Sequence, residues 1–133
     1  MSGEWCDRSL VTTPFNFCLC VTPEQYAKEL EKLGIKGDHP FILPGSGASL
    51  HRFDSSSPNE PPLAFICIDP DGMELNQVHA LLVHEAMHLW RYTKKELGET
   101  KPSKEFEAYA IQAISQRLFY AYDELTKKRK KKK

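Results

Sequence analysis

The chain has 133 residues and a formal net charge of zero, with 41% hydrophobic and 27% charged residues. This length suits one domain with one hydrophobic core and leaves no room for a separate recognition module. The sequence lacks both the ~20-residue apolar stretch that spans a bilayer and the basic, then apolar, start of a secretory signal. These features argue against a membrane protein or a membrane partner, and they predict a protein of the cytoplasm.

Hydrophobic patterning in the first half predicts short strands around one surface helix. The helix begins after Thr22, a residue type that caps helix N-termini, and ends at Gly34. Apolar side chains recur at helical spacing between these two residues. Strands are expected where apolar, aromatic and β-branched residues lie between Pro, Gly and Ser: at 15–21, weakly at 41–43, at 48–53, and most clearly at 63–68.

The second half predicts two long helices. The first follows the turn-forming residues 69–72 and carries apolar side chains around most of its circumference, which is typical of a buried helix. The second runs from about Ser103, its expected N-cap, to Leu125, after a break at Gly98 and Pro102. This order predicts an α+β domain in which a small, mostly antiparallel sheet packs on the first long helix.

The C-terminal residues 127–133 are all Lys or Arg, and the rest of the chain is negatively charged. A block of like charges is typical of a solvated, disordered tail, so the sequence predicts a single domain over residues 1–126 followed by this tail. A basic tail attracts nucleic acid weakly and without sequence specificity. No aromatic residues interleave with the basic run, and nucleic acid is therefore not an expected specific partner.

Four cysteines raise the question of disulfides or a second metal site, because an even count in a short chain sometimes forms a framework. Cys18 and Cys20 alternate in a predicted strand and so share one face, while Cys67 lies in another apolar run. No Cys-x-x-Cys pair is present. The sequence therefore predicts buried free thiols.

The most informative stretch is His84-Glu85-Ala86-Met87-His88. An α-helix turns by about 100° per residue, so His84 and His88 lie one above the other. Two imidazoles at this spacing can bind one zinc ion, and Glu85 can then accept a proton from the activated water. The alternative is a metal-free helix with ordinary histidines, but burying such groups without partners costs several kcal/mol.

A third metal ligand is expected on the second long helix. Its predicted apolar stripe contains Ala110, Ile114 and Leu118, and Glu107 lies at the centre of this stripe. A carboxylate in that position needs a partner, and two histidines on a neighbouring helix need a third ligand. Glu107 is therefore the predicted third ligand; Glu105, on the more polar face, is the alternative.

The arrangement from His84 to Glu107 resembles the gluzincins, zinc peptidases that include thermolysin and the large aminopeptidases. Residues 82–114 also resemble small zincin-like proteins encoded by phages and prophages. The resemblance implies a minimal zincin-like domain, a Zn²⁺ cofactor and hydrolysis of peptide bonds, and it implies the host cytoplasm for a phage-encoded chain. The sequence has no thermolysin-like C-terminal domain and no aminopeptidase signature, so their substrates do not transfer.

Three protein ligands leave a fourth zinc position for water, which is the mark of a catalytic site. Glu85 is the expected general base that passes the proton to the leaving amine. Gluzincins add a Tyr or His that stabilises the oxyanion, and Tyr92, one turn beyond His88, is the first candidate here. The other candidates are Tyr109, Tyr120, His51 and His79.

The expected partner is a peptide or protein substrate. In the zincins that the chain resembles, an edge strand of the sheet pairs with the extended peptide, and residues 48–53 or 63–68 are the candidates. A different hypothesis keeps the zincin scaffold but not the chemistry. In that case the chain is a catalytically silent or self-regulated protein-binding module.

Overall fold

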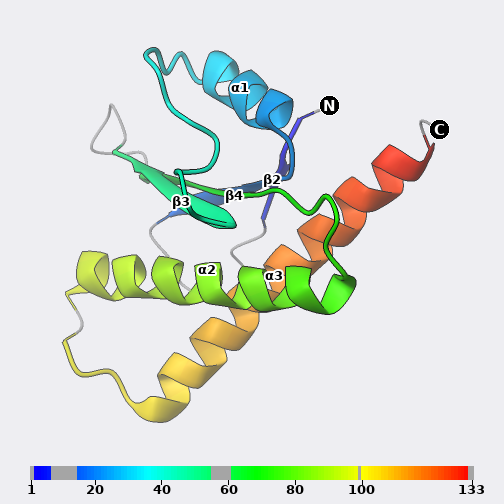
Figure 1. Cartoon of the computed structure of the whole chain (residues 1–133). Coiled ribbons are helices and arrows are strands. Elements are labelled where there is room, and N and C mark those ends of the chain that lie inside the picture. The colour runs from blue at the N-terminus through cyan, green and yellow to red at the C-terminus, as the bar shows by residue number, and fades with distance from the viewer. Residues whose placement is uncertain (1, 7–14, 55–60, 99, 132–133) are drawn as a thin grey trace.

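The structure is a computed structural model that describes residues 2–6, 15–54, 61–98 and 100–131. One sheet lies between two helical layers, with α1 on one face and α2 and α3 on the other (Figure 1). This is an α+β domain, as the order of the predicted elements indicated. Within the described residues, the elements are β1 (Glu4–Trp5), β2 (Asn16–Cys20), α1 (Pro23–Lys32), β3 (Ala48–Phe53), β4 (Leu63–Ile68), α2 (Leu75–Leu97) and α3 (Lys104–Lys131).

The strand order is β1-β2-β4-β3, and the sheet is mixed. β1 pairs antiparallel with β2, and β3 pairs antiparallel with β4, but the central pair of β2 and β4 is parallel. Two of the three pairings are thus antiparallel, as expected for a mostly antiparallel sheet, and the parallel pairing arises because a crossover through α1 and β3 returns the chain in the same direction. β3 is an edge strand and β4 is not, which distinguishes the two strands that the sequence left open.

The two central strands are buried on both faces, which explains why their sequences read as continuous apolar runs. On one face, Phe17, Leu19 and Ile66 pack against α2 and α3 in the main core. On the other face, Cys18, Cys20 and Cys67 pack against α1. All three thiols are buried and free, as predicted, and Cys6 is also free.

α1 is capped and attached by side chains at both of its ends. The Gln25 backbone N–H donates to Thr22 Oγ1 over 3.1 Å, which confirms Thr22 as the N-cap. Trp5 Nε1 on β1 donates to the buried Glu29 Oε2 over 2.8 Å, so β1 and α1 are tied together on one face of the sheet. The two-residue strand β1 was not predicted, because two residues are too few to carry a periodic pattern.

The weak strand predicted at 41–43 is absent, and the structure has bends there instead. The reason is that side chains of β3 satisfy the backbone of this segment. Ser49 Oγ accepts a hydrogen bond from the Leu43 N–H over 3.0 Å, and His51 Nε2 lies 2.9 Å from the Phe41 carbonyl oxygen. The strands predicted at 48–53 and 63–68 are confirmed.

α2 is less buried than its composition indicated. Val83 and Met87 are 41% and 38% exposed, so the expectation of a helix buried on all sides is corrected. One side, which includes Leu82, Ala86 and Leu89, lies in the core. The helix ends at Gly98, which adopts a left-handed conformation with φ 72°, a conformation that favours glycine.

α3 buries the stripe that its sequence predicted, through Ala110, Ile114, Leu118, Ala121 and Leu125. The helix then continues to Lys131, and the disordered tail from residue 127 stays a prediction. Residues 132–133 lie outside the described part of the chain. Across the described residues, neither α3 nor any other helix is long and apolar enough to cross a membrane.

Tyr26 offers a test of the packing between α1 and the sheet. Its hydroxyl group is buried and has no hydrogen-bond partner among the described residues, and burial raises the pKa of this group. Because an unpaired buried hydroxyl is costly, we expect Tyr26→Phe to raise the free energy of unfolding by about 1 kcal/mol. Urea denaturation measures this, with the exposed Tyr120→Phe as the control. A loss of stability in Tyr26→Phe would show that the hydroxyl has a partner.

Candidate metal site

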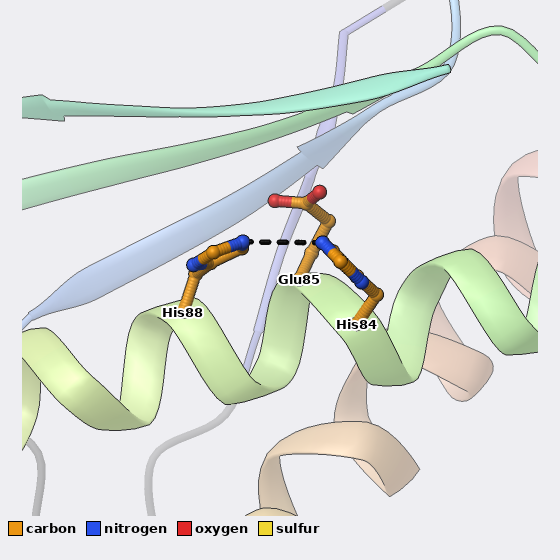
Figure 2. A group of neighbouring side chains, drawn as sticks. All are labelled: His84, Glu85 and His88. Carbon is orange, nitrogen blue, oxygen red and sulfur yellow. Dashed lines mark hydrogen bonds between the residues drawn. The ribbon is translucent and has the colours of Figure 1, made fainter. Parts of the chain in front are cut away.

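His84, Glu85 and His88 come together on the side of α2 that faces the sheet (Figure 2). The Nε2 atoms of the two histidines are 3.2 Å apart, as their spacing of one helical turn predicts. One potential ligand atom from each of the three residues lies within 4.8 Å of the others. Within the described ranges, this is the one group of three or more His, Cys, Asp or Glu side chains that meets that limit.

The spacing of the two histidines fits a single zinc ion. Two nitrogen ligands at about 2.0–2.1 Å from a tetrahedral ion are about 3.3 Å apart. The observed separation of 3.2 Å is close to this value. Without an ion, one ring N–H can donate to the other ring, depending on the tautomers. The pair is thus already placed at the distance that metal binding needs.

Glu85 differs from the histidines in its exposure to solvent. It is only 4% exposed, whereas His84 is exposed and His88 is half-buried. Burial raises the pKa of Glu85 above its ordinary value, while His88, His84 and His51 act in the opposite direction. A carboxylate with a raised pKa is a better proton acceptor near neutral pH. The motif predicted the position of Glu85, but its burial depends on how α2 packs.

A pocket of about 270 Å³ opens between α2 and β3 at this group. Ala48, Ser49 and Leu50 of β3 line one side of it. The other side is formed by α2, and the loop before β3 closes one end. The complete lining is Leu43, Ser46, Ala48, Ser49, Leu50, His84, Glu85, His88 and Tyr92.

Of the five candidates for oxyanion stabilisation, only Tyr92 lines this pocket. Tyr109 and Tyr120 lie on α3 and are each 65% exposed. His79 stacks on Phe119, with ring centroids 4.3 Å apart. His51 stacks on Tyr26 at 5.1 Å, on the α1 side of the sheet.

Tyr92 is held between two side chains from other elements. Its ring meets Phe15 edge-on at 6.4 Å, and the Arg52 guanidinium lies over the ring, 5.2 Å from the centroid. Sequence reasoning missed Arg52. Its alternation with Ala48 and Leu50 in the predicted strand indicated a shared face, but not which helix that face meets.

Glu107 is not brought to the histidines. Its Oε2 accepts hydrogen bonds from Trp90 Nε1 over 2.8 Å and from Lys94 Nζ over 3.2 Å, and these two contacts lower its pKa. α2 continues to Leu97, so α3 begins beside the last turns of α2 rather than beside the motif. Neither Glu107 nor Glu105 is in the ligand group found among the described residues. A ligand role for Glu107 stays a prediction, and it requires the carboxylate to leave Trp90 and Lys94.

Comparison of the chain with protein-family models, curated proteins and solved structures found no match. The chemistry of the site is therefore argued from its own residues. Two histidines at a metal-binding distance, a buried carboxylate and an open pocket are the features that carry the argument.

The contacts of Glu107 predict a structural role that can be measured without metal. In the presence of EDTA, we expect Glu107→Gln to lower the melting temperature by a few degrees, because the ion pair with Lys94 is lost and the remaining hydrogen bonds to a neutral acceptor are weaker. Glu105→Gln is the matched control, since it removes a negative charge from the same first turn of α3 at an exposed position. Equal melting temperatures for the two variants would contradict the structural role.

Proposed function

We propose that the chain is a zinc-dependent metallopeptidase on a minimal zincin-like domain. Its active site, formed by His84, Glu85 and His88, would hydrolyse peptide bonds of a substrate. The observation that carries this proposal is the 3.2 Å separation of the two histidine Nε2 atoms next to the buried Glu85. The pocket between α2 and β3 gives a substrate access to them.

His84 and His88 would hold zinc through their Nε2 atoms, and Glu107 is the proposed third ligand after it releases Trp90 and Lys94. When bound, zinc would supply Lewis-acid polarisation of the substrate carbonyl and activation of water. Glu85 supplies the proton transfer: its carboxylate accepts a proton from the attacking water and delivers it to the nitrogen of the leaving amine. The burial of Glu85 supports this role, because desolvation makes the carboxylate more basic.

The substrate would bind as an extended peptide along β3. This strand is at the edge of the sheet, and its residues Ala48 and Leu50 line the same pocket as the histidines. Edge strands offer free backbone N–H and C=O groups that an added peptide strand can pair with. Tyr92 lines the pocket one turn of α2 beyond His88, from where its hydroxyl can donate to the oxyanion that forms on the substrate.

Metal content tests the first part of the proposal. We expect the wild type to bind about one zinc ion per chain, measured by elemental analysis and by titration against a competing chelator. His84→Ala and His88→Ala should each lose the ion. His39 lies in a distant loop, so the control variant His39→Ala should retain it. Zinc retained in both motif variants would remove the basis of the proposal.

The same titration decides the role of Glu107. A ligand role requires that Glu107→Gln weakens zinc binding while Lys94→Met does not, because loss of the lysine frees the carboxylate. Equal zinc affinity in the wild type and Glu107→Gln would instead limit Glu107 to its structural contact with α2.

Cleavage of an unbiased peptide pool, followed by mass spectrometry, tests the second part. We expect Glu85→Gln to reduce the rate by roughly 10²–10⁴, because the amide has the shape of the carboxylate but cannot accept the proton. The exposed Glu31→Gln on α1 is the control and should cleave as the wild type does. Indistinguishable rates for Glu85→Gln and the wild type would contradict the peptidase mechanism.

A second candidate is a catalytically silent or self-regulated scaffold that binds protein. It is favoured by one observation, namely that the Glu107 carboxylate is bound by Trp90 and Lys94 and lies outside the ligand group found among the described residues. This candidate predicts zinc binding weaker than that of a three-ligand site, with no cleavage of the peptide pool by the wild type. The two experiments above therefore separate the candidates.

A further inference from the structure

We propose that Arg52 makes the site selective for peptides that carry a carboxylate close to the bond that is cut. This inference rests on the proposed peptidase function and names the class of substrate. Arg52 lies near the C-terminal end of the edge strand β3, and its side chain reaches over α2 to Tyr92, which lines the pocket. It therefore provides a cation at one end of the groove that a bound peptide would follow.

The groove has a direction, because β3 and α2 run side by side in the same sense. Gly47, just before β3, lies against Leu81 near the start of the motif. Near the other end of β3, Arg52 contacts Tyr92 and lies 3.8 Å from Glu96. A peptide paired with β3 would pass the histidines and then reach the guanidinium of Arg52.

The distance along this groove places Arg52 near the reacting bond. His84, His88, Tyr92 and Glu96 are each four residues apart, so they form one stripe along α2. Tyr92, under the guanidinium, is one turn of about 5.4 Å beyond His88. An extended peptide rises about 3.3 Å per residue, so Arg52 is about two residues from the bond that is cut.

Arg52 is available for a substrate because its ion pairs within the protein are loose. Its nitrogens lie 3.8 Å from Glu96 Oε1 and 3.9 Å from Oδ1 of Asp54, whose side chain is 85% exposed. These separations are longer than the roughly 2.7–2.9 Å of charge-assisted hydrogen bonds, and exposed pairs of this kind contribute little. A peptide carboxylate could replace them at low cost.

The ring of Tyr92 helps to position the guanidinium of Arg52 for binding a carboxylate. The guanidinium carbon lies over the ring, 5.2 Å from its centroid, and this cation–π contact favours a position of the charge beside the pocket. The planar fork of an arginine matches a carboxylate through two parallel hydrogen bonds. The pocket lining itself contains no Lys or Arg, so Arg52 supplies a charge that the lining lacks.

Three peptide pools test the proposal and distinguish two sources of the carboxylate. The first contains an internal Glu and an amidated C-terminus, the second has Gln in place of Glu with a free C-terminal carboxylate, and the third has Gln with an amidated C-terminus. For each pool, kcat/KM is measured by mass spectrometry, and affinity is measured by fluorescence anisotropy on zinc-loaded Glu85→Gln. The proteins are the wild type, Arg52→Gln and Arg52→Lys, with Lys28→Gln on the far side of the sheet as the net-charge control.

We expect the wild type to prefer one of the carboxylate pools over the neutral pool by roughly tenfold, the effect of a charge-assisted hydrogen bond at a partly exposed site. Which pool is preferred identifies the carboxylate as internal or C-terminal. Arg52→Gln should abolish the preference, Arg52→Lys should keep part of it, and Lys28→Gln should keep it whole. If Arg52 only positions Tyr92, Arg52→Gln lowers all three rates by the same factor and leaves their ratio unchanged, which overturns the proposal.

Failure of the proposed function gives a different pattern. If the wild type cleaves none of the pools, the peptidase assignment fails. The affinities measured by anisotropy then test whether Arg52 recognises a carboxylate. A carboxylate preference in binding that Arg52→Gln removes would still support recognition by Arg52. Equal affinities for all three pools, in Glu85→Gln and in Glu85→Gln combined with Arg52→Gln, would reject it.

Discussion

The packing of α2 against the sheet is the constraint on which the site depends, because this one helix carries His84, Glu85 and His88. Apolar side chains such as Leu82, Ala86 and Leu89 lie in the core and hold the helix at one rotation about its axis. A rotation by one residue, about 100°, would turn the histidines away from β3. The geometry of the site is therefore maintained by the same contacts that stabilise the domain.

The same packing divides the motif into two environments. Glu85 is on the buried side of the pocket, where desolvation raises its pKa, and the two histidines are nearer to solvent. An ion approaching from solvent would meet the imidazoles first, while the carboxylate stays in a drier place next to them. Burial and the neighbouring imidazoles thus act on the pKa of Glu85 in opposite directions.

Much of this architecture could be predicted from the sequence where a pattern is long or specific. The motif, the strands at 48–53 and 63–68, and the buried stripe of α3 follow from local spacing, and the structure has them. The position of Glu107 shows the limit of such reasoning. A helical wheel gives the face on which a residue lies but not its position along the neighbouring helix, which depends on where α2 ends and α3 begins. The contact of Arg52 with Tyr92 could not be predicted, because it depends on β3 facing α2, a tertiary contact that no local pattern encodes.

The parallel pairing of β2 with β4 has a consequence for the order in which the domain forms. This pairing joins Asn16 to Leu63, whereas the antiparallel pairing of β3 with β4 and the contact of α2 with α3 join nearer segments. Closing the longer loop carries a larger entropic cost before its contacts form, so β2 should insert after the nearer pairs are in place. The pocket is lined by residues between Leu43 and Leu50 on one side and between His84 and Tyr92 on the other. The central strand β2 therefore contributes to the core beneath the pocket, whereas the pocket lining comes from β3, the loop before it and α2.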